Sequence, residues 1–229
     1  MKENASILRT LQLFLFPTFL LFISCEKDID EKIDYAPSHI QAVDLGLSVK
    51  WANCNIGADS PENHGGYYAW GETTEKEEYT SQTYKHYLGD LNENGIYNES
   101  EEYKNIGDNI SGTIYDAART KWGGTWRMPT NEEFKELCKK CSWAATEING
   151  IKGKLITGPN GNSIFLPCTG ISSEKEPDTK EIGSYWSANL GFSRSFASCI
   201  LFIYNDIVSG DREWNAYRQY GLPIRPVTE

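Results

Sequence analysis

The chain has 229 residues, of which 39% are apolar and seven are tryptophan, enough to bury the core of one domain or of two small ones. Asp and Glu number 32 against 22 Lys and Arg, so the formal net charge is -10. A surface of this sign repels phosphate backbones and anionic lipid surfaces, which argues against a nucleic-acid partner.

The first 24 residues differ in composition from the rest of the chain. Lys2 and Arg9 precede the apolar run "LQLFLFPTFLLFIS". This run is short for a bilayer span, which needs about 20 residues, but it has the length of the hydrophobic part of an export signal. We therefore predict that residues 1–24 are a signal peptide.

The residues around Cys25 resemble a bacterial lipobox. "FISC" ends at Cys25, and "CEKDIDEK" places acidic residues directly after it. The resemblance implies cleavage before Cys25, acylation of that cysteine and export to the outer face of the outer membrane, as in Bacteroidota-type bacteria. Several acyl chains on one residue give a lasting anchor, so we expect membrane contact through the lipid only. Residues 25–41 then form the lipidated cysteine and an acidic tether, and the folded domain begins near Ala42.

The first half of that domain alternates short strands with loops. "VDLGLSVKWANCNIG" and "GGYYAWGE" are rich in Val and aromatic residues and predict strands. An acidic, tyrosine-bearing insertion follows at about residues 73–112, and we expect it to have little core of its own. "IYDAARTKW" then predicts a small helix that ends at the Gly123–Gly124 turn.

A second helix is predicted at residues 131–141. Thr130 can cap it, Glu133 completes a capping box, and apolar residues recur at three- and four-residue spacing. Cys138 and Cys141 fall at its C-terminal end, where the helix dipole disfavours a thiolate, so we interpret them as small core residues. A zinc site there would need two more ligands, and the three histidines of the chain show no ligand spacing.

The second half of the domain is dominated by strands. "KGKLITG" and "NSIFLP" are joined through "PNG", which predicts a hairpin. "SYWSA", "ASCILFIYN" and "GLPIRPV" predict three further strands. Two helices in the first half and antiparallel strands in the second predict an α+β fold.

Taken in order, these landmarks resemble the Fibrobacter succinogenes major paralogous domain family over nearly all of residues 42–229. The resemblance implies a C-type-lectin-like fold, related to the formylglycine-generating enzyme fold, with two helices packed on short antiparallel strands and with long loops. Related enzymes use a cysteine pair or iron-binding histidines, whereas Cys199 stands alone and no histidine follows His86. We also find no G-x-S-x-G, H-E-x-x-H or phosphate-binding glycine loop, so we expect no enzymatic activity.

In folds of this kind, the segment between the "YWS" and "RPV" strands is the displayed surface. Aromatic and arginine residues give large contact areas at low entropic cost and are typical interface anchors. The resemblance and this composition together predict a site for a glycan or protein ligand at Arg194, Tyr204, Arg212, Trp214, Tyr217, Arg218 and Tyr220.

Three alternatives stay open at this point. Trp214 and some of the tyrosines can instead close the domain core. The same loops can bury a partner if the protein is a structural subunit of a surface appendage or lipoprotein complex. Acids such as Glu72 and Glu213 can serve a polysaccharide hydrolase.

Calcium is the one cofactor that the sequence suggests, at two places. "GDLNENGIYNESEE" fits a twelve-residue calcium loop, although its flanks lack the helical period of an EF-hand and a polar turn is the alternative. The ligands would be Asp90, Asn92, Asn94, Glu101 and the carbonyl oxygen of Ile96. "EPD" and "YND" resemble the calcium motifs of sugar-binding lectins and supply Glu176, Asp178, Asn205 and Asp206.

Overall fold

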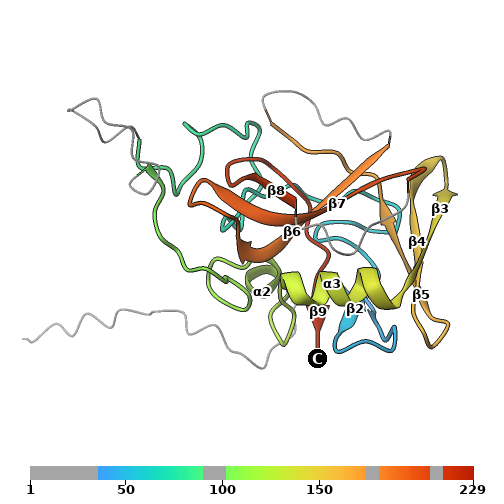
Figure 1. Cartoon of the computed structure of the whole chain (residues 1–229). Helices are drawn as coiled ribbons and strands as arrows, with labels where there is room; N and C mark the ends of the chain where they lie inside the picture. The colour runs from blue at the N-terminus through green and yellow to red at the C-terminus, as the bar shows by residue number, and fades with distance from the viewer. Residues whose placement is uncertain (1–35, 90–101, 174–180, 207–213) are drawn as a thin grey trace, which may run out of the picture.

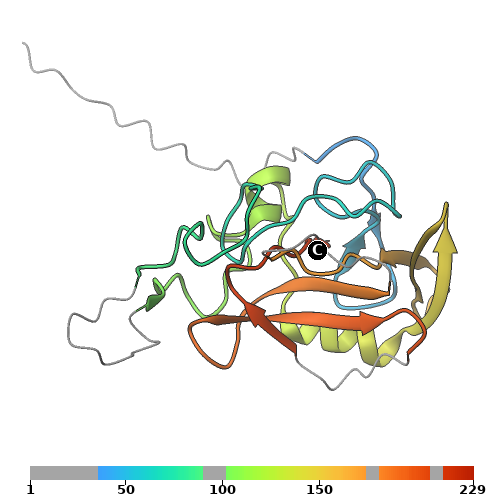
Figure 2. The same ribbon diagram turned by 90° about the horizontal axis from the view of Figure 1, so that it is seen from above.

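Three small antiparallel sheets and two helices make up the described part of the protein, which covers residues 36–89, 102–173, 181–206 and 214–229 of a computed structural model (Figure 1). The β3-β4-β5 sheet stands at one end and the described parts of the insertion at the other, with the β6-β7-β8 sheet between them (Figures 1 and 2). The predicted α+β class is confirmed.

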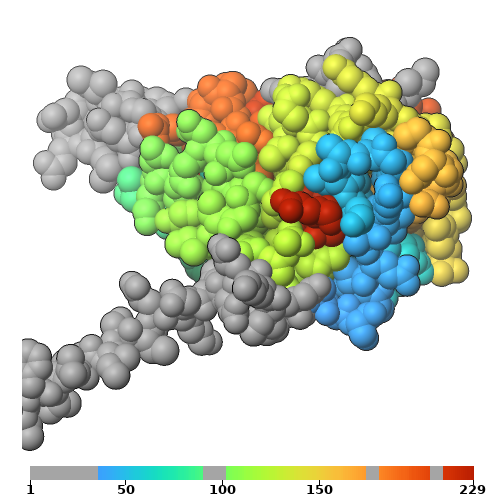
Figure 3. All heavy atoms as spheres, turned by 90° about the horizontal axis from the view of Figure 1, so that it is seen from below, coloured from blue at the N-terminus to red at the C-terminus, as the bar shows by residue number. Residues whose placement is uncertain are grey.

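The first sheet joins the two ends of the domain. Its strands β1 (Ala42–Val43), β2 (Lys50–Ala52) and β9 (Val227–Thr228) lie in the order β1-β2-β9. Figure 3 shows the C-terminal residues in red, between the blue N-terminal segment and the green middle of the chain. The ends of the domain are therefore held together by backbone hydrogen bonds.

The predicted tether is too long at its C-terminal end. The side chains of Ala36 and Ile40 pack against the core, so the chain is already folded there. Asn53 accepts a hydrogen bond from the Gln41 amide at 2.8 Å, and its own amide donates to the His39 carbonyl at 3.2 Å. The domain start near Ala42 was wrong, because a short apolar contact inside a polar stretch was overlooked.

Residues 1–35 lie outside the described part of the chain, and with them the predicted signal peptide and Cys25. Among the residues that the structure describes, no helix has the length and apolar character needed to span a bilayer.

Both predicted helices form, and the second begins with the expected capping box. Helix α3 (Asn131–Lys140) starts where the Glu133 amide donates to the Thr130 hydroxyl at 3.3 Å and the Thr130 amide donates to the Glu133 carboxylate at 2.7 Å. It buries Phe134 and Leu137 and packs on β6 and β7. Helix α2 (Ala117–Trp122) is shorter than predicted and ends at Gly123, whose φ of 66° suits glycine.

The predicted hairpin is confirmed, but the strand beside it was missed. Strands β4 (Ile151–Thr157) and β5 (Ser163–Pro167) pair as expected. Strand β3 (Ser142–Ile148) follows α3 directly and pairs with β4 along its full length. None of its side chains is fully buried, so the sequence carries little of the apolar alternation that identifies a strand.

The third sheet contains β6 (Ile182–Leu190), β7 (Phe196–Ile203) and β8 (Trp214–Tyr217) in that order. Strand β6 was predicted in shorter form, at residues 184–188, and β7 was predicted slightly displaced, at residues 197–205. Strand β8 was taken for loop. The predicted strands "GGYYAWGE" and "GLPIRPV" were largely wrong. They make isolated bridges, Tyr68–Leu222, Ser172–Gly221 and Arg127–Val227, and the short β9 begins at Val227.

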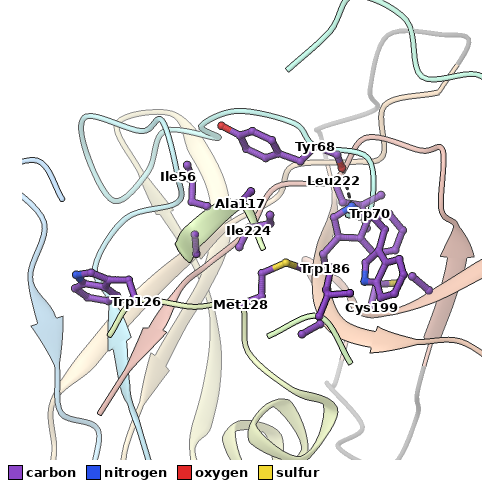
Figure 4. Packing of buried hydrophobic residues seen from close by; sticks show 14 of the residues in the cluster. Ile56, Tyr68, Trp70, Ala117, Trp126, Met128, Trp186, Cys199, Leu222 and Ile224 are labelled. Atoms are coloured by element: carbon purple, nitrogen blue, oxygen red, sulfur yellow. Dashed lines mark hydrogen bonds between the residues drawn. The ribbon is translucent and has the colours of Figure 1, made fainter. Parts of the chain in front are cut away.

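Two buried tryptophans tie the first half of the domain to the third sheet (Figure 4). The indole N–H of Trp186 donates to the Tyr68 carbonyl at 2.7 Å, and that of Trp70 donates to the Ser187 carbonyl at 3.0 Å. Both indoles are 0% exposed. The "YYAW" and "SYWS" segments therefore interlock through reciprocal hydrogen bonds inside the core.

Candidate binding surface

Four aromatic rings form a continuous stack on the third sheet. Phe192 stacks on Phe196 with ring centroids 4.5 Å apart, and Phe196 stacks on Tyr217 at 4.3 Å. Tyr220 meets Tyr217 edge to face at 5.4 Å. We call these four residues the aromatic surface, because Phe192 is 75% and Tyr217 40% exposed.

Strand register and a tight turn bring these rings together. Phe196 of β7 lies directly opposite Tyr217 of β8. The β6–β7 turn is closed by the Gly191 amide, which donates to the Phe196 carbonyl at 2.9 Å. A Cβ atom on Gly191 would come within 2.3 Å of the Asn215 side-chain oxygen, so a larger residue in this turn would have to displace the Asn215 side chain of β8.

Arg218 was predicted to be a ligand anchor, and the structure corrects this. Its side chain is 1% exposed, and its Nε–H donates to the Tyr84 hydroxyl at 2.9 Å. One Nη donates to the Arg194 carbonyl at 2.9 Å, and both Nη atoms reach the Lys104 carbonyl. Because all three guanidinium nitrogens donate to groups inside the protein, Arg218 holds the turn that carries Arg194 and does not face a ligand.

Aromatic rings complete the environment of Arg218. The guanidinium carbon lies 4.9 Å from the Trp70 ring centroid and 5.5 and 5.6 Å from those of Tyr84 and Tyr103. Rings of this kind attract a cation through their electron-rich faces. Burial lowers the pKa of Arg218 from its ordinary value, although this group remains charged near neutral pH.

The remaining predicted ligand residues do not form one cluster. Tyr217 and Tyr220 belong to the aromatic surface, and the half-buried Arg194 lies in its turn. Tyr204 follows the opposite end of β7, which puts it about 25 Å from Phe196 at ~3.3 Å per residue. Its ring lies under the Lys152 ammonium at 5.0 Å. Trp214 is 39% exposed at the start of β8, and Arg212 lies outside the described residues.

Sequence reasoning missed Phe192 and Phe196. Both flank the polar turn "SRS" in "GFSRSF", and an aromatic residue beside a Gly- and Ser-rich turn is a pattern that predicts an exposed ring. Phe196 directly precedes the predicted core strand at residues 197–205 and was not considered as a ligand residue. Only its register with Tyr217 reveals the stack.

The two candidate calcium sites rest mainly on residues outside the described part of the chain. Asp90, Asn92, Asn94, Ile96 and Glu101 all lie there, as do Glu176 and Asp178. Among the described residues, no group of three or more His, Cys, Asp or Glu side chains could hold a metal ion.

Of the proposed calcium ligands, the structure describes Asn205 and Asp206. Asn205 and Asp206 follow β7, and the Asp206 carbonyl accepts a hydrogen bond from the buried Lys154 ammonium at 2.7 Å. In the described flanks of the predicted calcium loop, residues 81–89 and 103–112 contain no helix.

Glu72, a candidate hydrolase acid, is held in a buried ion pair. Its carboxylate lies 3.0 Å from the Lys76 ammonium and accepts the Lys85 amide at 2.7 Å. The side chain is almost fully covered while that of Lys76 is partly exposed. Glu72 therefore fixes a turn of the insertion, and Glu213 lies outside the described residues.

Comparisons with protein-family models, with curated proteins and with solved structures find no match for this chain. The resemblance to the Fibrobacter succinogenes major paralogous domain family thus rests on the landmarks themselves. Several of those landmarks have structural roles. The "WANCNIG", "IFLP" and "IRPV" segments meet around Arg225, which is 0% exposed.

Proposed function

We propose that this protein is a cell-surface recognition lipoprotein that binds a glycan or protein ligand through the aromatic surface and catalyses no reaction. The observation that carries the proposal is the exposed ring stack on the third sheet. Leaving large rings in water forgoes about 25 cal/mol for each Å² of apolar area, and clustered exposed rings mark interaction sites.

The rigidity of the stack favours this use. Each ring is held by its neighbour, by the β7–β8 register or by the turn at Gly191, so little side-chain freedom is lost on binding. Exposed aromatic rings can pack against the C–H groups of a sugar or the apolar side chains of a protein. Both ligand classes would be bound through apolar contact with the rings.

A C-type-lectin-like fold is part of the proposal. It is supported by the two helices, the short antiparallel strands, the long connections and the pairing of the domain ends through β2 and β9. Trp70, Trp186 and Arg225 lie in the sequence landmarks that carry the family resemblance, and all three are buried. These landmarks can therefore be explained by the fold, without a bound ligand.

A matched pair of variants tests the aromatic surface. Phe192→Ala with Tyr217→Ala removes two exposed rings, and Ile114→Ala removes an exposed apolar side chain elsewhere, at 66% exposure. Wild type is first screened on an array of bacterial and plant polysaccharides and, in parallel, by cross-linking on cells. We expect the double variant to lose at least about tenfold in affinity for whatever wild type binds, and the control to retain it. Equal binding by both variants, with melting temperatures unchanged, would remove this surface from the proposal.

A structural subunit is the second candidate, because β8 is an edge strand and the rings beside it could be buried by a partner chain. A stoichiometric complex purified from membranes, together with a silent polysaccharide array, would favour it. Release of reducing ends from any polysaccharide would instead favour a hydrolase.

The membrane anchor has its own test. We expect Cys25→Ala to leave an unprocessed or soluble protein, while wild type is extracted only with detergent and carries the added mass of acyl chains. Identical mass and extraction for the two proteins would contradict lipidation at Cys25.

A further inference from the structure

The end of helix α3 places two thiols on the same side of the chain. Cys138 lies in the last turn and Cys141 is the C-cap residue, whose amide donates to the Leu137 carbonyl at 3.2 Å. The backbone thus follows the helical path up to Cys141. In that geometry residues three apart have Cα atoms about 5 Å apart, and disulfides bridge Cα atoms separated by about 4.4–6.8 Å.

The surroundings distinguish this pair from the other described cysteines. Cys54, Cys168 and Cys199 are buried, whereas Cys138 and Cys141 are each partly exposed. Burial, and to a lesser extent the neighbouring Cys141 sulfur, raise the pKa of Cys138 to about 12. Neither thiol is therefore a spontaneous nucleophile near neutral pH, and an oxidant must act on them.

We propose that Cys138 and Cys141 form a disulfide when the protein meets an oxidising compartment, which rests on the export that is part of the proposed function. A disulfide-bearing oxidant is attacked by one cysteine, and the second cysteine then displaces it from the mixed disulfide. One S–S bond forms in the protein, two S–H bonds break, and the S–S bond of the oxidant breaks. The two electrons reduce the two oxidant sulfurs to thiols, and the two protons end on those sulfurs or in water.

The bond would fasten the junction between α3 and an edge strand. Strand β3 begins at Ser142, directly after Cys141, and none of the described strands pairs with its outer side (Figure 1). Cβ atoms three residues apart on a helix are about 5–6 Å apart, so the last turn must tighten by 1–2 Å to close the bond. Cys141 already has extended dihedrals, with φ −103° and ψ 154°, so the adjustment falls where the helix ends.

Peptide mapping of the full-length chain provides a direct test. Trypsin cuts after Lys139 and Lys140, between the two cysteines, so a disulfide leaves the peptide 136–139 joined to the peptide 141–152. Protein purified from membranes, and a reduced sample treated with oxidised glutathione, are both denatured in N-ethylmaleimide before digestion. We expect the joined peptides, about two mass units below the sum of their thiol forms, while Cys54, Cys168 and Cys199 carry the label.

The Cys138→Ser variant serves as the matched control. Its Cys141 should carry the label, and reduction should lower the melting temperature of oxidised wild type by a few degrees without changing that of the variant. Labelled Cys138 and Cys141 after glutathione treatment, or either one joined to another cysteine, would overturn the proposal. A disulfide formed with glutathione but missing from membrane-purified protein would instead support the site and contradict export.

Discussion

Arg225 and Arg218 stand seven residues apart in the chain, are both buried, and hold together two different regions of the molecule. Arg225 donates to the Asn55 side chain at 2.8 Å and to the carbonyls of Ala52, Asn53 and Phe165 at 3.0–3.1 Å. It therefore joins the N-terminal segment to β5 beneath the first sheet.

Arg218 holds the insertion in the same way. It connects Tyr84 and Lys104, which lie before and after residues 90–101 in the chain, to the turn that carries Arg194. Tyr79, Tyr84 and Tyr103 are 3–6% exposed and form an aromatic core of the insertion. The expectation that the insertion has little core of its own was wrong, because its tyrosines pack around a cation supplied by the end of the chain.

Each region is built around one buried guanidinium whose observed partners are neutral. Carbonyl oxygens satisfy Arg225, and carbonyls with ring faces satisfy Arg218. A planar group with five N–H donors can bind several chain segments at once, whereas an apolar side chain of the same size can only fill space.

The largest expected effect is the loss of Arg225. Arg225→Met leaves four oxygen acceptors buried without a donor, and we expect the free energy of unfolding to fall by about 4 kcal/mol or more. Urea unfolding followed by tryptophan fluorescence measures it. Arg225→Lys should be nearly as damaging, since an ammonium cannot reproduce the planar fork. A loss below about 1 kcal/mol would contradict the view that the hydrogen bonds of Arg225 hold these segments together.

Arg218→Met should cost less and act locally. We expect a loss of about 3 kcal/mol, with most of the loosening confined to the insertion. The amides of Leu88 and Lys104, which bond across the insertion to Glu102 and His86, should exchange hydrogen faster, while amides of β4 keep their protection. Uniform acceleration across the domain would mean that the two regions form one cooperative unit.

Asp116→Asn tests a buried carboxylate that caps α2, outside the two arginine sites. Both carboxylate oxygens of Asp116 accept two backbone N–H groups each, and the four donors are Gly112, Ala118, Arg119 and Met128. An asparagine turns an NH2 group toward two of these donors. We expect a loss of about 2 kcal/mol, measured by thermal unfolding, whereas a variant within about 0.5 kcal/mol of wild type would show that the cap is dispensable.

The smallest effect is a pH dependence located in the insertion. Burial lowers the pKa of His86, which also faces the Arg218 charge and bonds to the Gly71 carbonyl at 3.0 Å. Below about pH 6.5 the unfolded chain takes up a proton that the folded protein refuses, so this contribution to stability is lost as the pH falls. Between pH 7 and pH 5, wild type should lose up to about 1 kcal/mol more than His86→Gln. Parallel pH curves for the two proteins would contradict it.

Local patterns predicted the parts of this fold whose stability is local. The capping box at Thr130 and the "PNG" hairpin involve neighbours in sequence, and both formed where expected. Strands β3 and β8 were missed because their identity depends on pairing with β4 and β7 and not on apolar alternation of their own. The predicted ligand segment contains the exposed aromatic stack, but Arg218 in it is buried, and Phe192 and Phe196 were overlooked.

The sequence by itself determined the α+β class, the two helices, the hairpin and the region in which exposed aromatic residues gather. Each of these depends on spacing, capping or turn chemistry within a few residues. Tertiary structure alone decided which arginine is buried and which rings stack. The sequence around an arginine does not show whether its side chain is exposed to water or is surrounded by oxygen acceptors, as that of Arg225 is. Phe196 faces Tyr217 because β7 and β8 pair in one register. Partners brought from more than a hundred residues away, such as Tyr84 for Arg218, leave no local pattern in the sequence.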